Sequence, residues 1–326
     1  MTTGKAPLAA FSAAVALFCS LAIAQAVETY PARPVRLIVP VAAGAAADVL
    51  ARLTAEWVGR ETGQPMIVEN RAGGGGAVAV ETVARAEPDG YTLLFPTNGT
   101  ITINRALAKD APIDTLDLVP IAPVAKTANL LVINADVPAH TLAELIALAK
   151  AHPGKIDYAS AGLGSTPHLA GAMFANLAGI DIVHVPYRGA APATNDLVAG
   201  NVQMLAIAYG TVAPFVADGK LRILAVAGPH RLPYLPDVPS AAEAGLPGWD
   251  METWYGLFGP KGTPLAVVDR LNQSVRRFLD DEHTKQRFAE GYYEPMKMTP
   301  EDFAAAVRAE AVKWQRFVHD AGIAPQ

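Results

Sequence analysis

The sequence predicts an α/β protein with two lobes, and three observations support this fold class. Short β-branched runs alternate with amphipathic helical segments, which is the pattern of βαβ units and mixed, mostly parallel sheets. The 326 residues suffice for about two domains of ordinary size. Two apolar segments, Val119–Val124 and Asn129–Asn134, follow each other with little helix between them and divide the alternating pattern into two series.

The first series forms the start of lobe 1. It begins with Pro34–Pro40, a β-branched run bounded by prolines that we interpret as a strand. A helix is predicted over Ala46–Thr62, because apolar residues recur near the helical period and Gly63 provides a stop. The next predicted elements are a strand at Met66–Glu69, a helix at Val78–Ala86 and a strand at Tyr91–Phe95.

The second series supplies lobe 2, and the C-terminal part is expected to return to lobe 1. Helices are predicted at Leu142–Ala151, Pro167–Ala178 and Ala193–Ala199, and strands at Ile156–Ala159, Ile182–Val185, Val202–Ala208 and Arg222–Ala227. After a proline-rich stretch, a strand at Trp254–Phe258 precedes helices at Leu265–Leu279 and Pro300–Val318. We therefore predict that residues 27–126 and 228–326 form lobe 1 and that residues 127–227 form lobe 2.

The first 26 residues have the layout of a secretory signal peptide. Lys5 belongs to a short basic start, an apolar run continues to Ala24, and the small-residue pattern Ala24-Gln25-Ala26 ends it. We predict cleavage after Ala26 and export from the cytoplasm. A transmembrane anchor and a lipoprotein attached at Cys19 are the alternatives. The alanine-rich run and the bulky Phe18 before Cys19 favour the signal peptide.

Composition excludes several classes of function. A hydrophobic content of 51% excludes a wholly disordered chain, and a net charge of -5 argues against non-specific binding to nucleic acid. Cys19 is the only cysteine, so the mature chain has no disulfide scaffold and no cysteine-based zinc site. The histidines are scattered without paired spacing, and no metal is predicted. Because no later stretch approaches 18 apolar residues, the mature protein is predicted to be soluble.

Two turns between a strand and a helix are candidate ligand sites, because backbone amides at a helix N-terminus bind anions. The first turn, Val41–Asp48, consists almost wholly of alanine and glycine, so a ligand can approach its peptide groups closely. A tightly packed turn is the alternative. Asp48 has two interpretations: it favours the helix dipole from the first turn, or it faces the ligand and accepts a hydrogen bond.

The second turn, Ser160–His168, places two glycines and several hydroxyls before a helix. Thr166 is predicted to cap this helix and Pro167 to occupy its first position. Pro167 stands where a dinucleotide-binding fingerprint requires its third glycine, so that function is not predicted. The glycine run Gly73–Gly76 lacks the Lys-Ser/Thr of a P-loop, and it is interpreted equally well as a flexible turn or as a ligand loop.

A secreted α/β hydrolase with Ser160 as nucleophile is the alternative function. Ser160 lies between strand and helix as in a nucleophile elbow, although Tyr158 replaces the first glycine of the GxSxG motif. Asp237 and His283 follow in the order that such an enzyme requires. A base within hydrogen-bond reach of the Ser160 hydroxyl would favour the enzyme, whereas a receptor needs none.

Several segments in a fixed order carry a family resemblance. They are Tyr30–Pro40, Glu69–Gly74, Pro88–Leu94, Tyr158–Gly162, His168–Gly171, Val185–Gly189, Leu235–Ser240, Glu243–Gly245 and Trp254–Pro260. Together they resemble the substrate-binding receptors of tripartite tricarboxylate transporters, the TctC or Bug family. The resemblance implies a two-lobed periplasmic binding protein of type II, with two strands crossing at a hinge. It also implies a periplasmic, monomeric receptor without cofactor or enzymatic activity, which delivers a small organic acid to membrane transporter subunits.

The resemblance further implies that both turns contact the ligand, largely through backbone groups. The family's first loop usually reads Pro-Phe-x-Pro-Gly-Gly, whereas Val41, Ala43 and Ala45 replace the Phe, the second Pro and the second Gly here. This smaller, more apolar wall favours an aromatic or longer-chain acid. A free Asp48 carboxylate that faces the ligand would repel a highly charged acid and, together with this wall, favour one or two negative charges over citrate. The candidate ligand-binding residues are Val41, Ala42, Ala43, Gly44, Ala45, Ala46, Asp48, Thr97, Ser160, Gly162, Gly164, Ser165, Thr166, His168, Arg188 and Tyr209.

Overall fold

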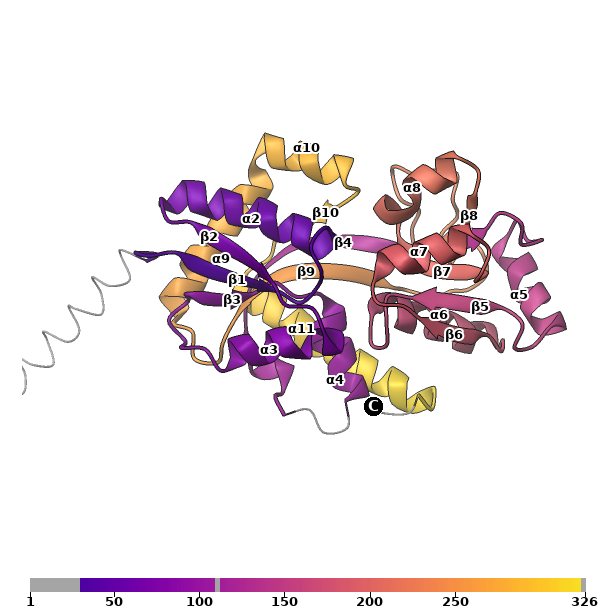
Figure 1. Ribbon diagram of the computed structural model, residues 1–326, viewed down its shortest axis with the longest axis horizontal. Helices are drawn as coiled ribbons and strands as arrows, with labels where there is room; N and C mark the ends of the chain where they lie inside the picture. Colours follow the sequence, from indigo (N-terminus) through magenta and orange to yellow (C-terminus); the bar gives the residue numbers. More distant parts are fainter. Residues whose placement is uncertain (1–29, 109–111, 324–326) are drawn as a thin grey trace, which may run out of the picture.

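Figure 1 shows the computed structural model of the protein, which describes residues 30–108 and 112–323. Two lobes lie side by side, and two long strands, β4 (Val119–Asn134) and β9 (Glu252–Gly259), run between them. Hydrogen bonds connect the strands in the order β2-β1-β3-β9-β4-β7-β5-β6, and β8 and β10 also pair with β4. This architecture is the predicted two-lobed α/β fold with two crossing strands. The predicted signal peptide lies outside the described residues.

Lobe 1 contains a parallel group of strands with helices on both faces. The strands are β1 (Val35–Val39), β2 (Met66–Asn70) and β3 (Thr92–Leu94), and β1 lies between the other two with Val35 opposite Met66. The helices are α2 (Ala46–Thr62), α3 (Ala77–Ala84), α9 (Leu265–Asp280) and α10 (Glu282–Glu290). Leu37 of β1, Leu50 of α2 and Leu271 of α9 belong to one buried core.

Lobe 2 repeats this arrangement with a second parallel group. Its strands are β5 (Asp157–Ser160), β6 (Val183–Pro186), β7 (Met204–Ala208) and β8 (Leu221–Val226). Its helices are α5 (Leu142–Ala151), α6 (Thr166–Ala178), α7 (Ala190–Val198) and α8 (Tyr209–Ala217). β5 is parallel to both β6 and β7. Because β7 and β8 pair with β4 in the antiparallel direction, the sheet as a whole is mixed.

Apart from the four-residue α4 (Asn104–Leu107), two helices, α8 and α10, were not predicted from the sequence, because their local signals are weak. α8 contains Gly210 and Pro214, and α10 carries few apolar residues. Tertiary packing stabilises both helices through Val212 and Phe288, which are buried. The remaining elements are η1 (Gly74–Gly76), η2 (Gly99–Ile103), α4 (Asn104–Leu107), η3 (Thr115–Asp117), β10 (Glu294–Pro295) and α11 (Pro300–Asp320).

The two apolar segments predicted at Val119–Val124 and Asn129–Asn134 form one continuous strand, β4, so their separation was wrong. The polar residues between them continue the strand because they pair across it. Lys126 lies opposite Trp254 of β9, and its Nζ is 2.6 Å from Glu252 Oε1. β4 pairs with β9 up to Ala128 and with β7 and β8 from there on, so one strand serves both lobes.

The directions of the strands bring the functional ends of both lobes together. β4 runs from lobe 1 into lobe 2 (Figure 1). β3 and β4 are each antiparallel to β9, so the parallel strands of lobe 1 run toward lobe 2. β7 is antiparallel to β4, so the parallel strands of lobe 2 run toward lobe 1. The carboxyl ends of both groups therefore meet at the junction of the lobes, where ligands of open α/β sheets bind.

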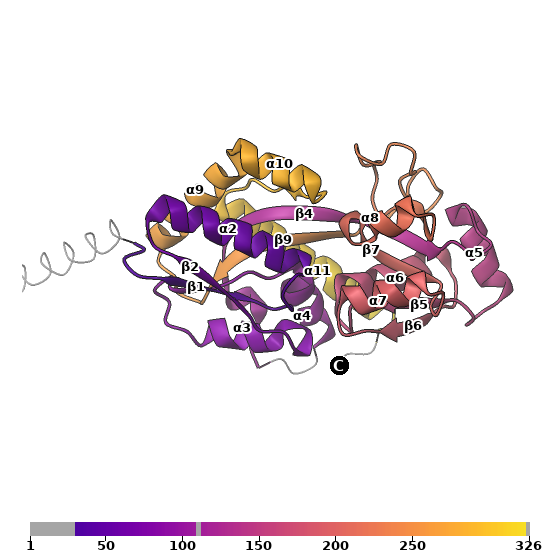
Figure 2. The ribbon, with the colours of Figure 1, turned by 45° about the horizontal axis from the view of Figure 1, so that its top comes forward.

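A third connection, not predicted, is helix α11, which passes along both lobes (Figure 2). Its first half places Phe303 in a core with Trp254 and Phe258, while its second half places Trp314 in the core of lobe 2 with Trp249. Residues of 241–251 also pack into that core. The segment 228–326 thus contributes to both lobes, because its apolar residues are buried against the adjacent sheet in each lobe. The lobe boundaries given in the sequence analysis stay a prediction.

Candidate ligand site between the lobes

Five helices begin after a parallel strand, and their N-termini lack side-chain caps. They are α2, α3, α6, α7 and α8, which follow β1, β2, β5, β6 and β7. Of the helices that begin elsewhere, α5, α10 and α11 are capped by Thr141, Asp281 and Thr299, whereas α9 and the short α4 have no side-chain cap. The first amides of an uncapped helix need another acceptor, which an anion can supply.

Residues 42–44 of the first predicted loop, between β1 and α2, are exposed. Asp48 lies beneath the loop and is only 3% exposed. Its Oδ2 accepts the N–H of Gly44 at 2.9 Å, and its Oδ1 accepts Nδ2 of Asn70 at 2.9 Å. Arg52 adds an ion pair to the same carboxylate at 3.0 Å, and Asn70 also donates to the carbonyl of Val41. Asp48 therefore holds the loop directly at Gly44 and, through Asn70, at Val41.

The structure contradicts the interpretation of Asp48 as a free carboxylate that faces the ligand. Burial by itself raises the pKa of Asp48, but hydrogen bonds from Arg52, Gly44 and Asn70 outweigh burial and hold the pKa below its ordinary range. Both oxygens are occupied by donors of the protein, and Arg52 compensates the charge. Asp48 thus acts on the ligand site by fixing the shape of the loop.

The hydroxyls of the second predicted loop are engaged inside the protein. The N-cap residue of α6 is Ser165, whose side chain makes no capping bond and instead donates to the carbonyl of Gly162 at 2.6 Å. Thr166 Oγ1 donates to Oδ1 of Asn98 at 3.2 Å. The predicted capping role of Thr166 is therefore wrong, because its hydroxyl bonds to lobe 1. The donors that remain for an anion are backbone amides.

Three loops of the two lobes meet where α6 begins. Asn98, after β3, is buried, and its Nδ2 donates to the carbonyl of Glu252 at 2.8 Å and to Glu310 Oε1 at 3.0 Å. Asn104 donates to the carbonyl of Gly75 in the glycine run at 2.5 Å and packs against Gly164. A Cβ added at Gly99 would contact the three predicted residues Thr97, Gly164 and Thr166. The structure therefore brings these residues together at the junction.

Ser160 has a base within hydrogen-bond reach, although not one that the sequence indicated. His184 Nε2 lies 2.6 Å from Ser160 Oγ, whereas Asp237 and His283 are exposed and make no contact with it. The side chain of Ser160 has no exposed surface, and its oxygen also accepts the N–H of Gly162 at 3.1 Å. Within residues 30–108 and 112–323, no carboxylate bonds to His184. The nearby base is the observation expected of the hydrolase, whereas the burial of the hydroxyl and the lack of a carboxylate that orients His184 in the described residues oppose that interpretation.

Two further candidates lie at the carboxyl ends of lobe 2 strands. Arg188 follows β6, is exposed and forms no ion pair with any residue that the structure describes. It is therefore a free cation next to the uncapped α7. Tyr209 follows β7. Its ring packs edge-on against that of Tyr292 of lobe 1, with ring centroids 4.6 Å apart, and stacks on that of Tyr234, with centroids 5.9 Å apart. Burial, followed by the neighbouring Tyr292, raises the pKa of Tyr209.

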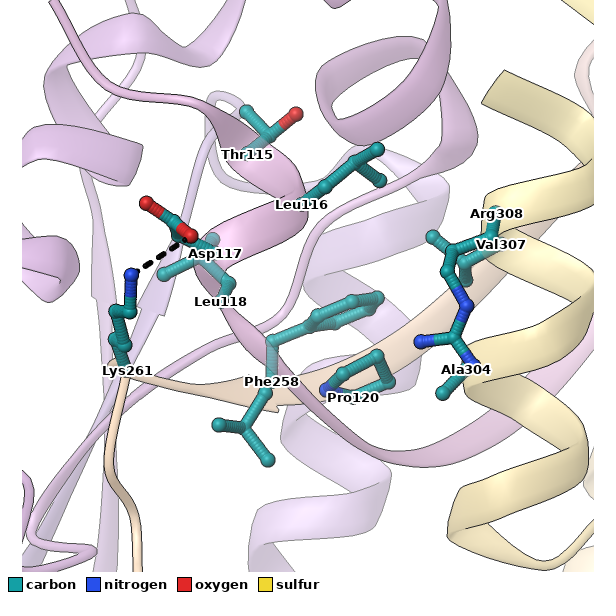
Figure 3. Close-up of a pocket in the computed structure, with 11 residues that line it drawn as sticks. Thr115, Leu116, Asp117, Leu118, Pro120, Phe258, Lys261, Ala304, Val307 and Arg308 are labelled. Atoms are coloured by element: carbon teal, nitrogen blue, oxygen red, sulfur yellow. Dashed lines mark hydrogen bonds and ion pairs between the residues drawn. The ribbon is translucent and has the colours of Figure 1, made fainter. Parts of the chain in front are cut away.

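A surface hollow of about 320 Å³ lies elsewhere, between η3, β9 and α11. Figure 3 shows Phe258 and Pro120 at its base, Arg308 on one side and the ion pair of Lys261 Nζ with Asp117 Oδ1, 3.0 Å long, on the other. It contains none of the predicted ligand-binding residues. In the described part of the chain, no group of three His, Cys, Asp or Glu residues is placed to hold a metal ion.

The fold and the converging strand ends define the class of the protein, a two-lobed periplasmic binding protein. A protein of R. palustris solved with adipate is 35% identical, with a TM-score of 0.86, and the match covers 91% of this chain and 100% of that one. A second protein of Rhodopseudomonas palustris, solved with bound malate, is 33% identical, with a TM-score of 0.82, and the match covers 89% of this chain and 100% of that one.

Among the residues that the structure describes, no helix combines the length and the apolar character that spanning a membrane requires.

The chain belongs to the family of tripartite tricarboxylate transporter receptors, whose profile matches residues 50–323. Protein BugT of Bordetella pertussis is 34% identical over 90% of this chain and 91% of its own length. The family consists of solute-binding receptors, as the resemblance implied. The first loop, at 41–48, lies outside the matched residues.

Proposed function

We propose that the protein is a periplasmic receptor that captures a small carboxylate between its lobes and delivers it to a tripartite tricarboxylate-type membrane transporter. The observation that supports this proposal best is the convergence of uncapped helix N-termini at the junction, with Arg188 next to the start of α7. Backbone amides and one cation bind a carboxylate without a metal or a buried counter-charge.

The proposed ligand is an acid with one or two carboxylates and an aliphatic or aromatic body. The first loop offers peptide groups and methyls, and Asp48 contributes no net charge because Arg52 neutralises it. Leu163, in the middle of the second loop, is 48% exposed and adds an apolar surface at the same junction. Adipate and malate in the related structures are both dicarboxylates, which supports the same class here.

Export through the predicted signal peptide places the receptor in the periplasm, and docking on transporter subunits completes its role. Closure of two hinged lobes around a solute is the usual mechanism of such receptors. β4, β9 and α11 are the connections about which the lobes would turn. The receptor needs no catalytic residue for this function, and Ser160 is buried accordingly.

A proline substitution tests the role of the backbone amides. Ala46 is the first residue of α2, and Ala45 before it has φ -72° and ψ 159°, which proline tolerates at the next position. Ala46→Pro therefore removes one free N–H and leaves the helix intact. We expect calorimetry to show adipate, malate or benzoate binding to the wild type and roughly tenfold weaker binding to the variant.

Glu282→Pro is the matched control, because it makes the same change at the first position of α10, away from the junction. It should leave the affinity unchanged. If the wild type binds none of the mono- and dicarboxylates, or binds citrate more tightly than all of them, the proposed ligand class is wrong. If Ala46→Pro binds as the wild type does, the first loop does not contribute its amide.

A further inference from the structure

A pair of stacked imidazoles lies directly behind the second ligand loop. The rings of His168 on α6 and His184 on β6 stack with centroids 4.2 Å apart, and Tyr158 on β5 stacks on the far side of His184 at 4.8 Å. Gly171 makes room for this stack, because a Cβ there would overlap the ring of Tyr158. The hydrolase interpretation would use only His184, as the base of Ser160, and the proposed receptor function assigns no role to the three rings.

Each histidine holds a different part of the loop. The Nδ1 atom of His168 accepts the N–H of Gly164 at 3.3 Å. The Nε2 atom of His184 lies 2.6 Å from Ser160 Oγ, which in turn accepts the N–H of Gly162 at 3.1 Å. Gly162 and Gly164 have positive φ values of 122° and 72°, a conformation that glycine adopts without steric cost, so hydrogen bonds to their amides help to select it.

We propose that His168 and His184 are positioning residues of the ligand loop: as an uncharged stacked pair they hold the amides of Gly162 and Gly164 and so set the backbone donors that face the ligand. This inference rests on the proposed receptor function, since it names what organises that site. His168 acts directly on the loop, and His184 acts through Ser160.

The uncharged state follows from the surroundings of the pair. α6 and β6 carry no other titratable side chain, and Asp157 of β5 acts on Tyr187 on the opposite face of the sheet. Tyr158 is neutral because burial raises its pKa. Burial lowers the pKa of His168 to about 4, and burial together with His168 lowers that of His184 to about 4.

Protonation of His168 and its hydrogen bond to the loop compete for the same atom, Nδ1. Because His168 Nδ1 accepts a hydrogen bond, its neutral ring carries the proton on Nε2, and a second proton must enter at Nδ1. A protonated His168 therefore releases the amide of Gly164. The ligand loop should lose its geometry near pH 4, while the rest of lobe 2 keeps its packing.

Two substitutions at position 168 separate hydrogen bonding from ring packing. His168→Asn keeps an acceptor near Nδ1 and cannot titrate, whereas His168→Phe keeps a ring and has no acceptor. The first readout needs no ligand: amide exchange and chemical shift of Gly164 in the glycine-labelled protein between pH 3.5 and 7. We expect the wild-type shift to follow a midpoint near pH 4 and His168→Asn to show no such step. We expect His168→Phe to exchange about five- to tenfold faster at pH 7.

The second readout is calorimetry with adipate at pH 7. His168→Asn should bind as the wild type does, and His168→Phe about five- to tenfold more weakly. His184→Gln, which can still reach Ser160, and His184→Phe form a second pair if a His168 variant fails to fold. His230→Asn, at an exposed histidine, is the matched control and should change nothing.

Unchanged exchange at Gly164 in His168→Phe would overturn the proposal, and so would a pH step in His168→Asn with the same size and midpoint as in the wild type. The same holds if both variants of a pair lose adipate binding equally, because that result indicates packing rather than hydrogen bonding. A wild type that does not bind adipate contradicts the ligand assignment alone, and the exchange measurement still decides the role of the histidines.

Discussion

At the scale of single residues, Gly171 leaves the space in which the ring of Tyr158 stacks on the histidine pair of lobe 2. In a helix, glycine costs up to about 1 kcal/mol relative to alanine, so an internal helical glycine such as Gly171 in α6 needs a compensating role. Its role is steric, because the ring of Tyr158 occupies the space that a Cβ would take. Packing at this residue therefore outweighs helix propensity.

Replacing Gly171 by alanine should destabilise the protein by about 1–3 kcal/mol, in spite of the gain in helix propensity. Urea unfolding measures the change. Gly228→Ala is the control: its nearest neighbour, Oδ1 of Asp250, lies 3.8 Å from an added Cβ, and we expect a change within about 0.5 kcal/mol. Equal stability of the two variants would contradict the steric role of Gly171.

The histidine pair should also make the stability of the protein depend on pH. The pKa of His168 lies at about 4 in the folded state, against 6.5 for the unperturbed group. Between these values the unfolded chain binds more protons, so stability falls as the pH is lowered from 6.5 toward 4 and loses nothing further from this group below 4. Thermal unfolding at pH 7 and pH 4.5 should therefore show a smaller decrease in Tm for His168→Asn than for the wild type. An equal decrease in both proteins would count against a buried neutral His168.

At the scale of elements, α11 joins two cores that belong to different lobes. Trp314 is 1% exposed and donates from Nε1 to Glu310 Oε1 at 3.2 Å, and Glu310 also accepts from Trp254 and from Asn98. This carboxylate thus connects α11 to β9 and to the loop after β3. The helix holds the back of the junction while the ligand loops lie at the strand ends.

Trp314→Ala should cost about 3–5 kcal/mol, because it removes a large buried side chain and leaves a cavity. Val312, two residues earlier on the same helix, is 60% exposed, and Val312→Ala should stay within about 0.5 kcal/mol. Chemical denaturation of both variants provides the comparison. A small effect of Trp314→Ala would mean that the end of α11 is not part of the lobe 2 core.

At the scale of the whole molecule, an aromatic contact connects the lobes on the side of α8 and α10. Tyr209 of lobe 2 and Tyr292 of lobe 1 meet edge-on, and Tyr234 packs on both. Tyr292 has a φ of 57°, and it is the only residue other than glycine with a positive φ in the described chain. Strain of this kind persists where the surrounding contacts require it.

A double-mutant cycle with Tyr209→Leu and Tyr292→Leu should give a coupling energy of about 0.5–1.5 kcal/mol in ligand-free unfolding. The pair Tyr30 and Tyr91, edge-on at 5.2 Å within lobe 1, is the control. If the lobes move, added adipate should change the first coupling and leave the second unchanged. A coupling near zero for Tyr209 and Tyr292 would mean that the aromatic contact does not hold the lobes together.

Local signals in the sequence determined most elements and the position of both candidate ligand loops. The helix Ala46–Thr62 was predicted to the residue, because Gly63 ends it in a left-handed conformation that favours glycine. The loops were predicted because small residues and glycines precede each helix. Helices without such signals, α8 and α10, were missed.

Contacts between distant residues were decided only by the tertiary structure. The sequence separated β4 into two segments, because Lys126 interrupts an apolar pattern, and only pairing with β9 shows that the strand continues. It left Asp48 with two roles until Asn70 and Arg52 were placed beside it. It gave no signal for His184 next to Ser160, 24 residues away, because the pairing of β5 with β6 creates that contact. Propensity and turn chemistry act over a few residues, whereas burial and hydrogen bonding join whatever the fold brings together.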